Sequence, residues 1–518
     1  MRCGLVVIVV VASSVARGAV DLGTPFADGV VLQRGCNVPV WGKATPKGKL
    51  IVSFAGRSVE GVVRDDGGWM LDLPPMEASK ESRTLTVEEI VRDSQDRLQT
   101  NKVEVGDVLV GEVWLCSGQS NADCPIWGDN PRFRDGMGAM SLQMTKKPFV
   151  RLAKTPHVAS VTPRFGYKAR WKPMSPEMFS SDRKSGMLPS AMGWYFALEL
   201  ANSLDIPIGL VDSSWGGTNI DAWTPRCGYE GIPELSDVAA LPLLESQEFA
   251  LARERGVYRG KGIYRQWIQQ PSALWNGMVA AYVPMACRGV IWYQGCHNIR
   301  EYQRYCLKMH ALYNGWSRAF GNEALRIYFV QLAPWGNPDI AKIQMEQARF
   351  AAEEKNAGMA VANDVGNLTD IHPNDKRTVA KRLAVHALRR DYGWSWVKDN
   401  SPTFRSMRVD GDRVILTFSD AEGWYLYNPK QGDCSNGFEI AGADGEFKSA
   451  EITNIVAPLN KDTNKPDFKG LIEGCDLVIR ANGVAKPRRV RYLHSAPWFG
   501  GLYNEVGLPL GAFEAEMR

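Results

Sequence analysis

Residues 113–124 read VWLCSGQSNADC and pass from an apolar run directly into small polar residues. The run, which begins at Val108, is typical of a buried strand, and the serines, glycine and asparagine that follow it are typical of a tight turn. A serine at a strand-to-helix turn exposes its hydroxyl, and the neighbouring backbone N–H groups point to the same place. The segment therefore predicts a strand that carries a nucleophile at its carboxyl end.

Four further apolar runs of the middle region end on unusual residues in the same way. They are IPIGLVDSSW before GGTN, GVIWY before QGCHN, RIYFVQLA before PW, and GMAVAND, which runs on to DIHP. Helical periodicity between these runs predicts a parallel sheet with crossover helices. In such a sheet the crevice lies beyond the carboxyl ends of the strands. We therefore expect the polar groups at these ends to converge on one site.

Ser120 is the predicted nucleophile of this site. Ser117 is the alternative, but it lies closer to the strand and no glycine precedes it. The turn GQSNA lacks the second glycine of the G-x-S-x-G elbow of α/β-hydrolases, so the motif alone is a weak signal. A polar turn without a catalytic role is the other interpretation of these residues on their own.

A serine nucleophile needs a base, and histidine is the usual one near neutral pH. Among the six histidines, His372 is the best candidate, because Asp370 precedes it by two residues in a loop and can orient its ring. His297 is the rival. The other four are interpreted as structural: His310 and His386 fall inside helical patterns, and His157 and His494 sit beside β or irregular segments without a polar cluster.

Length and composition set the number of domains and exclude some partners. A chain of 518 residues is too long for one compact core, so two or three domains are expected. A net charge of +4, without a run rich in Lys and Arg, excludes an extended nucleic-acid surface. Strand rhythm at both ends predicts a β-sandwich domain at 21–102 and a β-rich domain at 396–518, with the catalytic α/β domain at 103–395 between them.

The first 18 residues have the pattern of a signal peptide. Arg2 supplies a basic start, the run LVVIVVVA follows, and small residues then form a cleavage site. We therefore expect a secreted or periplasmic protein, and no transmembrane segment after the signal. Ten cysteines are present, nine of them after Cys3, and export permits disulfides among these. Their spacings lack the paired C-x-x-C form of a zinc site, so we expect no structural metal and no cofactor.

Taken together, the motifs resemble those of the sialate O-acetylesterase family of SGNH-type hydrolases. Four motifs in order carry the resemblance: GQSN at 118–121, WGGTNIDAW at 215–223, GVIWYQG at 289–295 and DIHP at 370–373. It extends to PFADGVVLQRGCNVPVWGKATPKG at 25–48, NGFEIAGADG at 436–445 and GLYNEVGLP at 501–509, which is nearly the whole mature chain. The resemblance implies an α/β fold in which an SGNH-hydrolase-like, three-layer parallel-sheet domain lies between N-terminal and C-terminal β-rich, sandwich-like domains.

The resemblance also implies a role for each motif residue. Ser120 would be the nucleophile and His372 the general base, with Asp370 orienting the base. The oxyanion hole would draw on the backbone N–H of Ser120, on the backbone N–H of Gly217 in the GGT turn, and on the side chain of Gln294. Bracing of the loop is the alternative role of Gln294. The oxyanion and substrate-binding set comprises Gly217, Gln294, Gln119 and Asn121.

The implied reaction is the hydrolysis of an acetyl ester on a sugar hydroxyl through an acetyl-enzyme. The foremost substrates are 9-O-acetyl sialic acids, and acetylated xylan and other acetylated glycans are the alternative. One departure stands out, because the family usually has QGESN where this chain has QGCHN at 294–298, which places Cys296 at the position of an acidic residue. The change leaves open a carbohydrate-binding protein with a weakened catalytic site, and a peptidase with the same triad is the third possibility.

Overall fold

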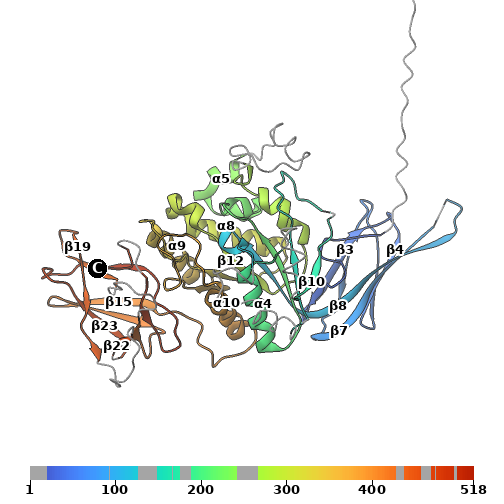
Figure 1. Cartoon of the computed structure of the whole chain (residues 1–518). Coiled ribbons are helices and arrows are strands. Elements are labelled where there is room, and N and C mark those ends of the chain that lie inside the picture. The colour runs from blue at the N-terminus through green and yellow to red at the C-terminus, as the bar shows by residue number, and fades with distance from the viewer. Residues whose placement is uncertain are drawn as a thin grey trace, which may run out of the picture.

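The computed structural model describes residues 20–92, 94–126, 147, 149–165, 167–175, 188–241, 267–427, 437–456, 468–472, 474–494 and 499–517. The expected signal peptide at 1–18 lies outside these residues. Figure 1 shows β sheets at the N-terminal end, an α/β region in the middle and further β sheets at the C-terminal end. This order is the α/β region with β-rich flanks that the sequence predicts. In the described part of the chain, no helix combines the length and the apolar character needed to cross a membrane.

The N-terminal region consists of short strands in two groups. One three-stranded sheet has the order β1-β3-β6, and β4 pairs with β5 and β7 in the other group. Alternate side chains of these strands face a common core, in which Val40, Leu50, Val52 and Leu73 are fully buried. The bounds are β1 Asp21–Leu22, β2 Val31–Gln33, β3 Val38–Lys43, β4 Lys49–Phe54, β5 Arg57–Val62, β6 Gly68–Leu73 and β7 Ser79–Arg92.

Strand β8 (Leu98–Gly118) joins the N-terminal region to the central sheet without a linker. Its first part pairs antiparallel with β7, and its second part pairs parallel with β2, β11 and β12. The first part alternates in burial, whereas the residues from Val108 onward are buried continuously, as in a strand covered on both faces. The domain boundary expected at 102/103 therefore lies inside one continuous strand.

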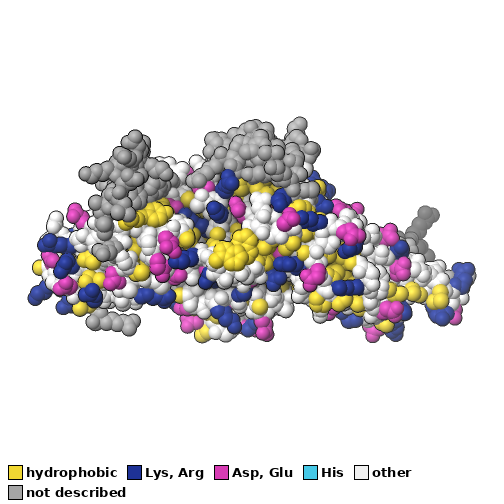
Figure 2. All heavy atoms as spheres, turned by 90° about the horizontal axis from the view of Figure 1, so that it is seen from below, with side chains coloured by type: hydrophobic (Ala, Val, Ile, Leu, Met, Phe, Trp, Pro, Cys, Tyr) yellow, Lys and Arg dark blue, Asp and Glu magenta, His cyan; other side chains and the backbone are white. Residues whose placement is uncertain are grey.

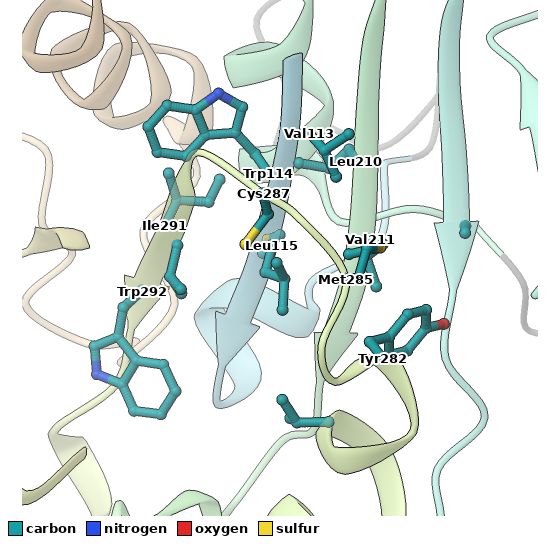
Figure 3. Packing of buried hydrophobic residues seen from close by; sticks show 14 of the residues in the cluster. Val113, Trp114, Leu115, Leu210, Val211, Tyr282, Met285, Cys287, Ile291 and Trp292 are labelled. Atoms are coloured by element: carbon teal, nitrogen blue, oxygen red, sulfur yellow. The ribbon is translucent and has the colours of Figure 1, made fainter. Parts of the chain in front are cut away.

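The central sheet has the order β10-β9-β11-β8-β12-β13-β14 and is parallel except for β10 at its edge. All five strands that the sequence predicts are present in it. Figure 3 shows Leu115, Leu210 and Ile291, from the neighbouring strands β8, β11 and β12, among the buried side chains of this sheet. The bounds are β9 Val150–Lys154, β10 Trp171–Pro173, β11 Ile208–Ser214, β12 Gly289–Tyr293, β13 Arg326–Val330 and β14 Ala357–Ala360.

Helices cover both faces of this sheet and complete three layers (Figure 1). On one face α4 packs against α10, and Phe196 of α4 meets the ring of Trp114 edge to face. Helices α8 and α9 pack on the other face. Trp316 of α8 contacts the ring of Trp292, and Phe350 of α9 contacts the ring of Phe329. The bounds are α1 Ser120–Asp123, α4 Ala191–Leu204, α5 Ser236–Ala240, α8 Tyr305–Ala319, α9 Ile340–Glu353 and α10 Lys376–Asp391.

The described residues of the C-terminal region form three four-stranded sheets around a core of their own. Val414, Leu416, Trp424 and Ile440 are fully buried there. Its strands are β15 Thr403–Asp410, β16 Arg413–Ser419, β17 Tyr425–Tyr427, β18 Phe438–Ala441, β19 Phe447–Ser449, β20 Glu451–Ile452, β21 Ile455–Val456, β22 Phe468–Ile472, β23 Asp476–Arg480, β24 Arg489–Tyr492, β25 Leu502–Tyr503 and β26 Phe513–Glu516. On the face of the molecule seen in Figure 2, basic and acidic side chains are interspersed along its whole length, which is unlike a nucleic-acid surface.

Candidate active site

Ser120 stands where β8 ends, at the first residue of the short helix α1. The turn depends on Gly118, whose φ is +135° and where an added Cβ would lie 2.2 Å from the carbonyl oxygen of Tyr293. The backbone N–H of Gln119 donates to that same carbonyl at 3.0 Å. A residue with a side chain could not make this close approach to β12, so the glycine positions the serine at the carboxyl edge of the sheet.

Ser120, His372 and Asp370 form a continuous hydrogen-bonded chain. The Ser120 hydroxyl and His372 Nε2 lie 3.0 Å apart, and His372 Nδ1 lies 3.0 Å from Asp370 Oδ1. The backbone N–H of His372 donates to the same carboxylate oxygen at 2.9 Å. Because an ionised carboxylate only accepts, Nδ1 carries the proton and Nε2 is left as the acceptor for the serine hydroxyl. The three residues that the sequence singles out are thus brought together, with the side chains of His372 and Asp370 about one-third exposed at 31% and 34%.

The two alternatives from the sequence have other surroundings. Ser117 is fully buried, and its hydroxyl donates to the carbonyl of Ser213 at 2.6 Å. His297 is exposed, and its backbone N–H donates to Gln119 Oε1 at 3.2 Å. Ser117 therefore joins two strands of the sheet, and His297 helps to fix the side chain that precedes Ser120.

The turn after β11 lies directly against Ser120. An added Cβ on Gly216 would stand 3.3 Å from the Cβ of Ser120, and the next residue, Gly217, has a φ of +74°. The backbone N–H of Gly216 donates to Asp123 Oδ2 at 3.2 Å, which anchors the turn to α1. Within the described part of the chain, neither the N–H of Ser120 nor that of Gly217 has a hydrogen-bond acceptor. Two backbone donors are therefore available beside the serine hydroxyl.

Gln294 occupies the end of β12 but its amide is already engaged. Its Nε2 donates to the carbonyl of Thr218 at 3.1 Å and to Asn298 Oδ1 at 2.7 Å, and its Oε1 accepts from the Tyr305 hydroxyl at 2.8 Å. Since an amide has two N–H donors, both are used. These contacts favour the bracing role of Gln294 over the oxyanion role that the resemblance implies.

Gln119 reaches the same loop from the nucleophile turn. Its Oε1 accepts from the backbone N–H groups of Gly295 and His297 at 3.3 and 3.2 Å. Its Nε2 has no acceptor among the described residues, although the residue is only 4% exposed. Gln119 therefore carries the side-chain amide donor next to Ser120 that remains available.

Lys376 is a site residue that the sequence analysis missed. It is buried at the start of α10, its ammonium contacts Asn121 Oδ1, and it lies 5.4 Å from the ring centre of Tyr293. A lysine at the start of a helix is normally solvated, so the sequence carries no signal of this burial.

A buried ionic cluster lies behind the nucleophile turn. Lys154 donates to Asp123 at 2.9 Å and to Asp212 at 3.0 Å, and Ser214 Oγ donates to the second oxygen of Asp212 at 2.6 Å. Burial opposes the charge on Lys154, but the carboxylates of Asp212 and Asp123 raise its pKa above the usual value. Burial likewise opposes the charge on Asp123, and Lys154 lowers the pKa of that carboxyl. Lys154 and Asp123 therefore stabilise one another in their charged forms.

His157 belongs to this cluster, although the sequence suggested no polar surroundings for it. Its Nε2 donates to the carbonyl of Ser214 at 2.9 Å and lies 3.5 Å from Asp123 Oδ1. The ring stacks on Trp215 with 4.5 Å between ring centres. The expectation for His157 was wrong because its partners come from segments far along the chain.

Cys296, the first residue at which the motif QGCHN differs from the usual QGESN, carries a neutral thiol. Burial raises the pKa of Cys296 to about 12, so it supplies no anion. A carboxylate enters the same loop from Glu301, which accepts from Asn298 Nδ2 at 2.8 Å and from Lys308 at 2.8 Å. Lys308 also donates to the buried Asp221 at 2.7 Å. The loop thus retains an acidic group, five residues after the position where the family usually has one.

Comparison with known proteins places the chain in a family. The family model described as "Carbohydrate esterase, sialic acid-specific acetylesterase" matches residues 110–389, which is more than half of the chain and includes Ser120, Gly217 and His372. The chain belongs to this family. It is therefore a carboxylic ester hydrolase.

Individual relatives agree with the family. Sialate O-acetylesterase of Rattus norvegicus is 29% identical over 443 residues, which cover 75% of this chain and 77% of that protein. The Homo sapiens enzyme of the same name is 26% identical over 396 residues, or 71% and 70% of the two chains. Among solved structures, a carbohydrate acetylesterase from Xanthomonas citri aligns with a TM-score of 0.76 and 28% identity, covering 96% of this chain and 100% of that one. The similarity to that structure extends over the β-rich regions as well as the α/β domain.

Proposed function

We propose that the protein is an exported serine esterase that hydrolyses O-acetyl esters on carbohydrates through an acetyl-enzyme, with 9-O-acetyl sialic acids as its first substrates. The observation that carries the proposal is the Ser120–His372–Asp370 chain beside two unengaged backbone N–H groups. The names of the relatives support the choice of an acetylated sugar, and the pattern of the first 18 residues supports export.

In the first half of the reaction, Ser120 Oγ attacks the acetyl carbonyl carbon while His372 Nε2 takes the hydroxyl proton. The carbonyl oxygen becomes an oxyanion, which accepts hydrogen bonds from the N–H groups of Ser120 and Gly217. The C–O bond to the sugar then breaks, and the imidazolium returns its proton to the departing sugar oxygen. Asp370 stabilises the imidazolium at Nδ1 throughout.

In the second half, water replaces the sugar. His372 takes a proton from the water, whose oxygen attacks the acetyl carbon on Ser120, and the same two N–H groups hold the second oxyanion. Collapse of this intermediate breaks the bond to Ser120 Oγ, which recovers its proton from His372, and acetate leaves. The proton of Ser120 leaves on the sugar hydroxyl, a proton from the water restores Ser120, and the acetic acid formed releases its own proton to solvent, so Ser120 and His372 end as they began.

The test is acetate release from a panel of p-nitrophenyl acetate, acetylated sialosides and acetylated xylo-oligosaccharides. We expect turnover of the first two, absence of turnover in Ser120→Ala, and near-normal turnover in the matched variant Ser117→Ala. Xylo-oligosaccharides as the preferred substrates would replace the sialate assignment. If no acetyl ester is hydrolysed, p-nitrophenyl acetate included, the alternative of a carbohydrate-binding protein with a weakened catalytic site would be favoured. Cleavage of casein would favour the alternative of a peptidase with the same triad.

Two further measurements examine the finer parts of the proposal. Acid quenching during turnover should trap an acetyl group on the peptide that contains Ser120, and a quench that never yields this peptide would count against the acetyl-enzyme. Fusion of residues 1–18 to a reporter that is active only outside the cytoplasm should yield activity. A silent fusion would remove the claim of export.

A further inference from the structure

Three potential metal ligands converge between helices α8 and α9, away from the esterase motifs. Cys306 and His310 are four residues apart on α8 and so share one face of the helix, and Glu353 is the last residue of α9. Cys306 Sγ lies 3.4 Å and His310 Nε2 lies 2.9 Å from the same oxygen, Glu353 Oε2. The three ligand atoms all lie within 4.8 Å of one another. Figure 1 shows the two helices side by side.

These separations are close to those of a zinc coordination sphere. Zinc binds thiolate sulfur at about 2.3 Å and imidazole nitrogen or carboxylate oxygen at about 2.0–2.2 Å, so in a tetrahedral site two N or O ligands stand roughly 3.3–3.6 Å apart and a sulfur and an oxygen roughly 3.5–3.7 Å apart. The sulfur-to-oxygen distance of 3.4 Å is a little shorter than this and needs a movement of only about 0.1–0.3 Å. The nitrogen-to-oxygen distance of 2.9 Å needs an outward movement of only a few tenths of an ångström. A thiolate, an imidazole and a carboxylate together are a ligand set that favours zinc.

Neighbouring side chains orient the ligands. Arg349 Nε donates to the other oxygen of Glu353, Oε1, at 2.9 Å, which leaves Oε2 directed at Cys306 and His310. The ring of Phe350 meets the ring of His310 edge to face at 4.9 Å. The side chains of His310 and Glu353 are 22% and 44% exposed, so water can reach the site as a fourth ligand. Such outer contacts hold metal ligands in their binding geometry.

We propose that Cys306, His310 and Glu353 form a Zn²⁺ site that clamps α8 to α9. Binding replaces the thiol proton of Cys306 by the metal and releases that proton to solvent, while Glu353 is already ionised and His310 binds as the neutral imidazole. The spacing of the cysteines predicted no structural metal because the chain lacks paired C-x-x-C motifs. Cys306 and His310 are instead four residues apart on one helix, and Glu353 comes from another helix, so a search for C-x-x-C pairs does not find this set.

The clamp has a consequence for the esterase site. Tyr305, next to Cys306 on α8, donates to the side chain of Gln294, and Gln347 of α9 donates to the backbone carbonyl of Gln294 at 3.3 Å. The two helices that zinc would join are therefore the two that hold this residue. The metal acts on the stability of the scaffold and takes no part in the chemistry.

The experiment measures zinc bound to the full chain after dialysis against zinc and then against buffer. We expect one equivalent more zinc in the wild type than in Cys306→Ser or His310→Gln, and the matched variant Cys227→Ser, whose half-buried thiol lies outside the cluster, should retain the wild-type content. Cobalt in place of zinc should give a thiolate-to-metal charge-transfer band in the wild type and in Cys227→Ser only. Zinc should also raise the Tm of these two proteins and leave the Tm of the ligand variants unchanged.

Equal zinc content in the wild type and His310→Gln, or a cobalt spectrum without the charge-transfer band, would overturn the proposal and leave a cluster of ordinary hydrogen bonds to Glu353. Because His310 is partly exposed, its variant tests the site even if Cys306→Ser fails to fold. The same titration in Ser120→Ala should give the wild-type zinc content, which separates this proposal from the proposed esterase function.

Discussion

Asn121 Nδ2 donates a hydrogen bond of 3.1 Å to the carbonyl of Ile371. Ile371 stands between Asp370 and His372, and Asn121 directly follows Ser120, so this one contact ties the nucleophile turn to the loop of the base. Lys376 holds the other end of the same amide by contacting Asn121 Oδ1. The distance between the serine hydroxyl and the imidazole therefore depends on a residue that touches neither of them.

Asn121→Ala should lower kcat by about 10- to 100-fold with little change in KM, because a misplacement of about 1 Å between reacting groups has an effect of this size. Kinetics on p-nitrophenyl acetate measure it. Asn454→Ala is the matched control, since Asn454 makes the same kind of contact, to the carbonyl of Asp476 at 2.9 Å, in the C-terminal region. A kcat within about threefold of the wild type would show that the loop keeps its position without Asn121.

The sequence is sufficient to predict those features that adjacent residues encode. The five parallel strands follow from apolar runs with helices between them, and Asp370 and His372 lie in one short motif, so a two-residue spacing already suggests their contact. The continuity of β8 is different. The sequence places a domain boundary at 102/103, but the strand continues through it and through Asp107, which adopts a φ of +52°.

The features that sequence reasoning missed depend on contacts between distant segments. The direction of the Gln294 amide is set by Thr218 and Tyr305, and the surroundings of His157 are set by Ser214 and Asp123. Burial of Lys376 depends on the packing of α10 against the nucleophile turn. None of these partners lies within one turn or one strand of the residue concerned, so no local pattern reports them.

Gln294→Ala should reduce stability and activity together. The substitution removes the donor to the buried Thr218 carbonyl, and a buried group left unsatisfied costs about 1–3 kcal/mol. Asn298 Oδ1 keeps the backbone N–H of Ile220, and the Tyr305 hydroxyl keeps the backbone carbonyl of residue 294. Thermal unfolding and kcat should be measured on the same preparation. A drop in kcat of about 10²–10³ with an unchanged Tm would instead identify Gln294 as a donor to the oxyanion.

Lys154→Met should destabilise the α/β domain strongly. It removes the lysine that Asp123 and Asp212 share and leaves the Asp212 carboxylate, 2% exposed, without a cation, for which about 3–5 kcal/mol is typical. Asp123, 19% exposed, keeps His157 at 3.5 Å. Denaturant unfolding measures the loss, and Lys168→Met, at a lysine with 47% exposure, should change stability by less than about 1 kcal/mol. Equal effects of the two variants would show that the buried cluster contributes no more than a surface ion pair.

Glu112 gives the protein a stability that depends on pH. This fully buried carboxylate of β8 accepts from Arg34 at 2.6 Å and from Arg288 at 3.0 Å. Burial alone would raise the pKa of Glu112, but Arg288 with the other donors lowers it below its ordinary 4.5. A lowered folded-state pKa means that the stabilisation is present above that ordinary value and is lost as the pH falls through the lower, folded-state one.

Glu112→Gln should therefore have a lower Tm than the wild type at neutral pH, and the difference should shrink once the pH falls below 4.5. Thermal unfolding of both proteins across this range isolates Glu112 from other carboxylates, because these titrate in both. Glu60→Gln, at a glutamate with 56% exposure, should follow the wild type at every pH. If the Tm difference stays the same below pH 4.5, the substitution acts through packing or hydrogen-bond geometry and not through the charge of Glu112.

Asp370→Asn should lower kcat by about two to four orders of magnitude, as loss of the correct histidine tautomer does in other triads. The carboxylate accepts the Nδ1 proton of His372, and an amide in the same place can present an N–H there, which forces the proton onto Nε2 and removes the acceptor for Ser120. Helix capping is not the role of Asp370, because Asp375 caps α10 by accepting from the N–H of Thr378 at 3.0 Å. Asp375→Asn is thus the matched control, with little expected effect on kcat and, since asparagine caps a helix about as well as aspartate, little effect on Tm. A loss smaller than about threefold in Asp370→Asn, alongside an inactive Ser120→Ala, would show that His372 works without this carboxylate.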